Sequence, residues 1–253
     1  MPTVTDLSVF RSISLFNNLT SEQLSRLEQL LYRKTFPAGT GLITSQQPGE
    51  VIYIILSGTV KVYEERPEGG SVTLSILAAG QVLGEIGLID SGSRSANAVT
   101  LEESTCLWMD RRSFNECLSA MPKLQHNLLF LLCSRLRLAN EQIKSLITQD
   151  VEGRVARQML AFAQLYGRLT ANGEVFIPLR LTQGDLANLI GATRERVNQV
   201  VAAYKHRKYI SVDQNYRITI HNPEALGKRS GTPFQRLHLS SHQPAQTSPT
   251  VFE

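Results

Sequence analysis

The sequence holds few residues of the kinds that build disulfide frameworks, metal centres or membrane spans. Its three cysteines, Cys106, Cys117 and Cys133, are widely spaced and form no Cys-x-x-Cys pair. We expect them to be small core residues in a reducing compartment rather than metal ligands. No apolar run approaches the ~18 residues of a membrane-spanning helix, and the amino terminus lacks a signal peptide. These absences predict a cytoplasmic protein with no membrane partner.

The motifs of common enzyme classes are also missing. The sequence contains no P-loop, no nucleophile elbow and no cluster of metal-binding residues. Its histidines are scattered along the chain and form no credible acid–base pair; they are His126, His206, His221, His238 and His242. We therefore predict no catalytic residue, no metal and no obligatory cofactor, and we do not expect an enzyme.

The charge of the chain is unevenly distributed. The 253 residues are 42% hydrophobic, which fits a globular protein of two domains. Residues 151–253 hold 13 Lys and Arg against 7 Asp and Glu, whereas residues 1–150 hold 13 against 15. A basic carboxy-terminal part favours contact with a polyanion such as a nucleic acid.

The amino-terminal part has a short helix followed by β-like texture. Residues 20–23 (Thr-Ser-Glu-Gln) form a capping box that predicts a helix start. From about Lys34 to Asp110, short β-branched runs such as 51–56, 59–63 and 71–77 alternate with turn residues at 57–58 and 66–70. This spacing is typical of antiparallel strands in a small barrel or roll.

The segment from Gly84 to Ala96 carries the chemistry of a phosphate site. A glycine-led turn that opens a short helix aims free N–H groups at an anion. Arg94 adds a guanidinium fork and Ser95 a hydroxyl, while Glu85 is suited to accept a hydrogen bond from a ribose hydroxyl. The alternative is a surface loop with a structural Glu85–Arg94 ion pair.

This segment resembles the phosphate-binding cassette of the cyclic-nucleotide-binding domains in CRP/FNR-family regulators. The resemblance implies that the sugar phosphate is held by Gly84, Glu85, Ile86, Arg94 and Ser95. Where cyclic AMP-binding members hold adenine with a Thr-Ser pair, this chain has Ala139 and Asn140. We therefore expect cyclic AMP or cyclic GMP as an effector, with altered base selectivity. A degenerate pocket controlled by a protein partner remains the alternative.

A long helix is predicted from Pro122 to about Gln149, after a short helix over 113–120. Its apolar residues recur at alternating steps of three and four, as in a coiled-coil seam: Leu129, Leu132, Leu136, Ala139, Ile143 and Leu146. A second stripe, suited to packing on the roll, holds Leu124, Leu128, Leu131 and Leu138. Two stripes indicate a second partner, and the resemblance implies a homodimer; a helix sunk in one core is the alternative.

Two short helices follow, over 181–191 and 192–204, joined through Gly191 as in a helix-turn-helix. Thr193 is the expected N-cap, and Arg194 and Glu195 stand where the family reads guanine and cytosine. Gln199 stands where the CRP branch of the family usually has a second arginine; a glutamine suits adenine, and the alternative is that it contacts no base. The alternative is a charged helix that contacts proteins. The predicted DNA-binding residues are Thr182, Gln183, Thr193, Arg194, Glu195, Arg196, Asn198, Gln199 and Lys205.

The resemblance covers residues 15–226 and implies an α+β fold with double-stranded DNA and RNA polymerase as partners. We expect a jelly-roll-like β-roll over 1–120, a dimerisation helix over 121–149, a winged helix-turn-helix over 150–226 and a disordered tail over 227–253. Gly153 suits a hinge between helix and head. An iron–sulfur sensor like FNR is disfavoured because no cysteine precedes Cys106, and a regulatory subunit is disfavoured by the helix-turn-helix.

Overall fold

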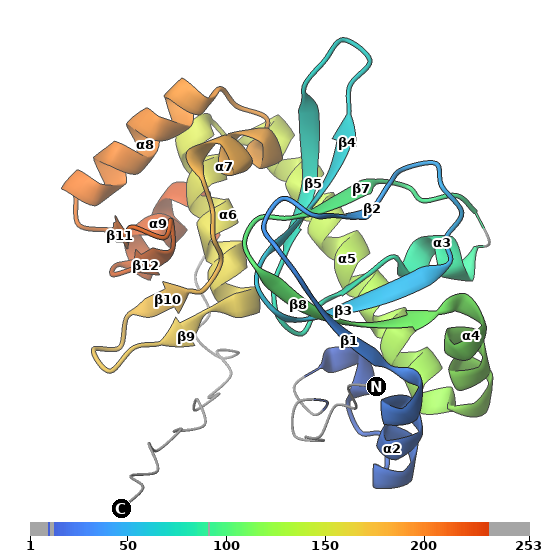
Figure 1. Cartoon of the computed structure of the whole chain (residues 1–253). Coiled ribbons are helices and arrows are strands. Elements are labelled where there is room, and N and C mark those ends of the chain that lie inside the picture. Colours follow the sequence, from blue (N-terminus) through green and yellow to red (C-terminus); the bar gives the residue numbers. More distant parts are fainter. Residues whose placement is uncertain (1–9, 11–12, 91, 233–253) are drawn as a thin grey trace, which may run out of the picture.

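The computed structural model describes Phe10, residues 13–90 and residues 92–232. A β-roll and a carboxy-terminal α/β unit lie side by side, and a long helix, α5, runs along the roll toward the second unit (Figure 1). The elements of the roll and the long helix are η1 (Ser14–Phe16), α2 (Ser21–Leu30), β1 (Tyr32–Phe36), β2 (Gly41–Ile43), β3 (Val51–Ser57), β4 (Val60–Glu65), β5 (Ser71–Leu77), β6 (Val82–Leu83), α3 (Glu85–Ile89), β7 (Asn97–Thr100), β8 (Ser104–Asp110), α4 (Arg111–Ala120) and α5 (Pro122–Thr148). The second unit contains α6 (Val151–Tyr166), β9 (Arg168–Leu169), β10 (Val175–Ile177), α7 (Gln183–Ile190), α8 (Arg194–His206), β11 (Ile210–Val212), β12 (Ile218–Ile220) and α9 (Pro223–Ser230).

The predicted β-roll is confirmed as two four-stranded antiparallel sheets. Their strand orders are β1-β8-β3-β6 and β2-β7-β4-β5. Because side chains alternate along a strand, β3 sends Ile52 and Ile54 into the core beneath the helices and Ile55 into the core between the sheets. Gly58 turns the chain between β3 and β4 with φ +94°, and a Cβ there would lie 2.2 Å from Ser104 Oγ. Only glycine fits this turn.

Short helices cover one end of the roll. The capping box predicted at Thr20 is confirmed, because its hydroxyl accepts from the Gln23 N–H while the Gln23 side chain accepts from the Thr20 N–H. α4 begins two residues earlier than predicted, where the Asp110 carboxylate caps it. Cys106 and Cys117 are buried as expected, and burial raises the pKa of Cys106 to about 12. Cys133 is exposed on α5, so its prediction as a core residue was wrong.

The long helix begins at Pro122 as predicted and packs on the roll through Leu124, Leu128 and Leu131. Leu138 does not continue this stripe. It is exposed, because the buried contact of α5 ends near Arg135 and the helix then leaves the roll core. Most of the predicted coiled-coil seam is also exposed: Leu129, Leu136, Ala139, Ile143 and Leu146, with Leu132 partly buried. An exposed apolar seam contradicts the alternative of a helix sunk in a single core.

The second unit joins α6, α7 and α8 to a four-stranded sheet of order β11-β12-β10-β9. The predicted wing is confirmed as the antiparallel β11–β12 pair, whereas β9 and β10 were not predicted. The tail was predicted to begin too early, because α9 continues through Ser230 and packs on α6. Residues 233–253 of that tail lie outside the described residues. Across the described ranges, no helix is both long and apolar enough to cross a membrane.

Candidate functional site

The first candidate site is the turn from β6 into α3, where Gly84 adopts φ +88°. A Cβ at Gly84 would lie 2.6 Å from Arg94 Nη1 and 2.9 Å from the Val51 carbonyl oxygen. The missing side chain therefore lets Arg94 approach the backbone, and its guanidinium donates to the carbonyls of Gly84 (2.8 Å) and Val51 (2.6 Å). Within the described part of the chain, two of its five N–H donors are used in this way.

Arg94 is held in an environment that disfavours its own charge. The residue is 7% exposed. Burial lowers the pKa of Arg94, and the nearby charge of Arg111 acts in the same direction, while the Tyr53 hydroxyl and the carboxylates of Glu50 and Glu85 oppose it. A bound phosphate would supply the missing negative charge at close range.

Glu85 lies on the other side of the same turn and is only 1% exposed. Its Oε1 accepts a hydrogen bond from Arg135 of α5, which also donates to the Val82 carbonyl. Its Oε2 is buried, and no residue in the described part of the chain forms a hydrogen bond with it. The alternative of a surface loop with a Glu85–Arg94 ion pair is thus contradicted, since both residues are buried and Glu85 pairs with Arg135.

Sequence reasoning missed Arg135. The residue occupies the roll-facing side of α5, four residues after Leu131, where the apolar stripe calls for another large hydrophobic residue. A charge on a buried helix face needs a partner of opposite sign. This signal was present in the sequence and could have linked Arg135 to Glu85.

The remaining predicted pocket residues lie at the mouth or on α5. Ser95 and Ile86 are exposed beside the turn. Ala139 and Asn140 are exposed on α5, about one helical turn beyond Arg135. Within the described ranges neither of these two residues makes a hydrogen bond to the Gly84–Ser95 segment. The structure therefore brings together the sugar-phosphate half of the predicted pocket and leaves the base-contacting half open.

The second candidate site is the helix-turn-helix formed by α7 and α8. α7 begins with a capping box between Thr182 and Asp185 and ends at Gly191, whose φ of +64° reverses the chain. Thr193 caps α8 as predicted by accepting from the Arg196 N–H. The buried face of α8 consists of Val197, Val200, Val201 and Tyr204, which recur at helical spacing.

The opposite face of α8 presents polar and basic side chains. The exposed residues include Thr193, Arg194, Glu195, Arg196, Asn198, Gln199 and Lys205, whereas Thr182 and Gln183 at the start of α7 are half-buried. Gln183 Nε2 donates to Asn198 Oδ1 (3.0 Å), which ties α7 to α8. Arg196 donates to Gln199 Oε1 (3.0 Å). An exposed helix start with arginines is the geometry that a helix-turn-helix uses to enter the major groove.

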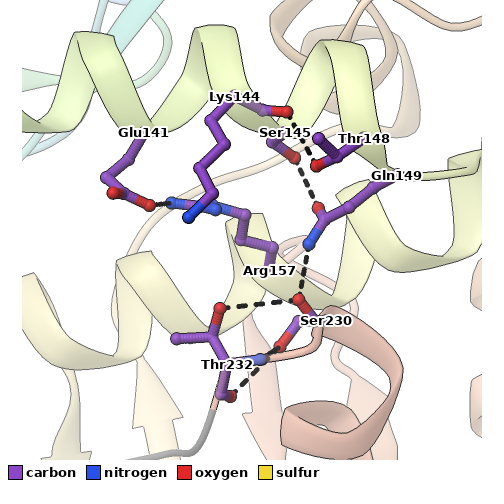
Figure 2. Close-up of polar contacts among 8 residues, drawn as sticks. All are labelled: Glu141, Lys144, Ser145, Thr148, Gln149, Arg157, Ser230 and Thr232. Atoms are coloured by element: carbon purple, nitrogen blue, oxygen red, sulfur yellow. Dashed lines mark hydrogen bonds and ion pairs between the residues drawn. The ribbon is translucent and has the colours of Figure 1, made fainter.

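Polar contacts bridge the junction between α5 and α6 (Figure 2). Ser145 donates to Gln149 Oε1, and Gln149 Nε2 donates to the carbonyl of Ser230 at the end of α9. Arg157 of α6 pairs with Glu141 of α5 at 2.6 Å. Gly153 is buried here, and a Cβ would lie 3.2 Å from the Arg229 carbonyl oxygen. This glycine admits α9 closely, which is a packing role beside the predicted hinge role.

The roll also touches the second unit directly. Thr59 donates to Glu102 Oε1 (2.6 Å), and Glu102 Oε2 pairs with Arg217 of the wing (3.1 Å). Lys61 lies 3.8 Å from the Asp185 carboxylate of α7. The roll and the helix-turn-helix are therefore joined by direct side-chain contacts as well as through α5.

Comparison with known proteins places both sites in one family. Residues 33–121 match the cyclic nucleotide-binding domain family, and residues 153–229 match the Crp-like helix-turn-helix domain family. The chain is 33% identical over 216 residues to the CRP-like cAMP-activated global transcriptional regulator of Mycobacterium tuberculosis, covering 85% of this chain and 96% of that protein. It is 30% identical to the cyclic AMP receptor protein of Thermus thermophilus, covering 75% and 84%.

Solved structures share the fold. FixK2 from Bradyrhizobium japonicum gives a TM-score of 0.68 at 17% identity, covering 79% of this chain and 96% of that one. A mutant of CooA from Carboxydothermus hydrogenoformans gives 0.67 at 20% identity, covering 91% and 98%. The Mycobacterium tuberculosis relative is named a transcriptional regulator. With a cyclic nucleotide-binding domain followed by a Crp-like helix-turn-helix, the chain belongs to the CRP/FNR family of DNA-binding transcription regulators.

Proposed function

We propose that this regulator is a homodimer that binds a palindromic DNA site and responds to a cyclic mononucleotide held in the β-roll. The observation that carries the proposal is the buried Oε2 of Glu85, which has no hydrogen-bond partner among the described residues. An unsatisfied buried polar atom costs about 1–3 kcal/mol. A ribose 2′-hydroxyl would donate to this oxygen once the side chains that cover it move aside, while the remaining N–H groups of Arg94 and the Ser95 hydroxyl would donate to the cyclic phosphate.

The residues at the base-binding side of the pocket do not identify which cyclic nucleotide binds. Ala139 has no polar side-chain atom, while Asn140 offers both a donor and an acceptor. Loss of one hydrogen bond changes affinity several-fold, since it is worth about 0.5–1.5 kcal/mol. The relatives named as cAMP-activated favour cyclic AMP as the first compound to test.

The exposed seam of α5 supports the homodimer. An apolar stripe of this length on one helix favours burial against a second copy of the same helix. Two-fold symmetry would place the two reading helices about one DNA turn, roughly 34 Å, apart. The operator would then be a palindrome, and the bound regulator would act on transcription through RNA polymerase.

Arg135 offers a physical link between the pocket and DNA binding. It contacts Glu85 from α5, and α5 continues through the Gln149 junction into the second unit. A ligand that takes part of the Glu85 charge changes the environment of Arg135 and hence of α5. Such a ligand is a switch only if it binds the two arrangements of the reading heads with different affinity.

One observation favours a second candidate, in which the pocket is a relic and a protein partner controls DNA binding. Two N–H groups of Arg94 are already satisfied by the backbone carbonyls of Gly84 and Val51, and Ala139 lacks a hydroxyl. The same regulator would then bind DNA without any nucleotide.

Unbiased selection of bound DNA, with and without cyclic AMP, cyclic GMP or cyclic di-GMP, tests both candidates. The proposal predicts a palindromic site whose recovery rises with a cyclic mononucleotide, accompanied by a thermal shift. Glu85→Gln should shift that nucleotide dependence to a several-fold higher nucleotide concentration, while the same site is still recovered at high protein concentration. A palindrome recovered equally under all conditions, with no thermal shift at millimolar nucleotide, contradicts the nucleotide-responsive candidate and supports the partner-controlled one.

A further inference from the structure

A second arginine, Arg111, holds the short helix α3 in place from outside the pocket. Its Nε donates to the Gly49 carbonyl (2.8 Å) and its Nη2 donates to the Gly87 carbonyl in the middle of α3 (2.7 Å). One rigid guanidinium fork thus joins the loop before β3 to the helix that carries Glu85. Arg111 itself is half-buried and is fixed at the start of α4, where its N–H donates to the Glu50 carbonyl (2.8 Å).

The same two segments touch at a point where only glycine fits. A Cβ at Gly49 would lie 2.8 Å from both the carbonyl carbon and the carbonyl oxygen of Gly87. The missing side chain of Gly49 therefore lets the two backbones approach, and Arg111 donates to a carbonyl on each side of the contact. Two independent features of the structure set the position of α3 against β3.

This position matters because α3 has only five residues. A helix of that length has no stability of its own in water. The direction of the Glu85 carboxylate and of the Gly84 turn depends on where the surrounding structure holds the helix.

We propose that Arg111 is a positioning residue for the cyclic nucleotide. It fixes α3 so that Glu85 meets the ribose while Arg94 meets the phosphate. The inference rests on the proposed function, because it concerns the affinity of that same pocket. Arg111 also lies close enough to Arg94 for its charge to lower the pKa of that guanidinium, so a purely electrostatic role must be separated from a geometric one.

Three variants separate the geometric role of Arg111 from its electrostatic role. Arg111→Gln removes the charge and the fork, and Arg111→Lys keeps the charge but replaces the fork with a single ammonium group. Gly49→Ala disturbs the same contact from the other side with Arg111 intact. The matched control is Arg112→Gln, since Arg112 is the next residue of α4, its side chain is 89% exposed, and it pairs with Glu116 on the same helix.

The experiment measures the cyclic AMP dissociation constant of the full-length chain by calorimetry, its melting temperature, and its operator affinity at saturating cyclic AMP. We expect Arg111→Gln, Arg111→Lys and Gly49→Ala each to weaken nucleotide binding about tenfold or more, with operator affinity restored at saturation. Arg112→Gln should bind within about twofold of wild type. If Arg111→Gln does not fold, the other two variants carry the same test.

Nucleotide binding by the folded Arg111 and Gly49 variants that equals wild type overturns the inference and leaves the proposed function standing. Unchanged binding by Arg111→Lys alone assigns Arg111 a charge effect and also overturns the positioning role. Absence of binding by the wild-type chain to cyclic AMP and cyclic GMP overturns the proposed function, and this inference with it.

Discussion

Replacing the seam residue Leu136 with alanine should weaken the proposed homodimer. Full burial of a leucine side chain is worth about 1.5–3 kcal/mol. Leu136 is 63% exposed in the single chain, so roughly 1–2 kcal/mol of that value remains for a partner to supply. Two-fold symmetry doubles the loss, which corresponds to a dissociation constant raised roughly 30- to 1,000-fold.

Sedimentation velocity over a concentration series measures this change. The control is Phe130→Ala, because Phe130 is 66% exposed but lies one residue after the seam residue Leu129, about 100° further round the helix. It should leave the dimer almost unchanged. Equal effects from the two variants, or a wild-type chain that stays monomeric at working concentrations, would refute the assignment of the seam.

Arg194→Ala should erase the sequence preference at the base pair that Arg194 contacts, a loss of about 1–3 kcal/mol of discrimination. Salt-dependent nonspecific binding should persist. If DNA selection still gave the wild-type preference, α8 would not be the reading helix. Glu102→Gln should weaken the contact between the roll and the wing and reduce the effect of nucleotide on operator affinity about two- to fivefold. Fluorescence anisotropy measures the ratio of operator affinities with and without nucleotide. An unchanged ratio would refute a role for this contact. Of the three cysteines, only Cys133 should react rapidly with iodoacetamide at pH 7.5. Cys106 and Cys117 are buried, and burial raises the pKa of both thiols. Rapid labelling of Cys106, measured by mass spectrometry, would contradict the packing of the roll.

Features signalled by neighbouring residues could be predicted from the sequence. The capping residues Thr20 and Thr193, the helix-starting Pro122 and the helix-ending Gly191 each act within a few positions of themselves. The buried face of α8 follows in the same way from its helical period. Local chemistry of this kind fixes where helices begin, end and turn their apolar side.

Features that depend on contacts between distant segments were missed. The Glu85–Arg135 pair joins residues 50 positions apart, and the Arg111–Gly87 bond joins residues 24 positions apart. β9 has only two residues and finds its stability by pairing with β10, so it leaves no alternating pattern to detect. Leu138 fits the apolar period of α5 but lies beyond the end of the buried contact, which only the folded roll defines.

The most direct test of the account is the cyclic AMP dissociation constant measured twice, for the free homodimer and for the homodimer bound to its selected operator. Coupling between two sites is reciprocal, so a nucleotide that changes operator affinity must itself bind with a different affinity once the operator is bound. Coupling between the pocket and the reading helices predicts a difference of about 5- to 150-fold between the two dissociation constants. Two equal constants would contradict it, because the pocket and the reading helices would then be independent.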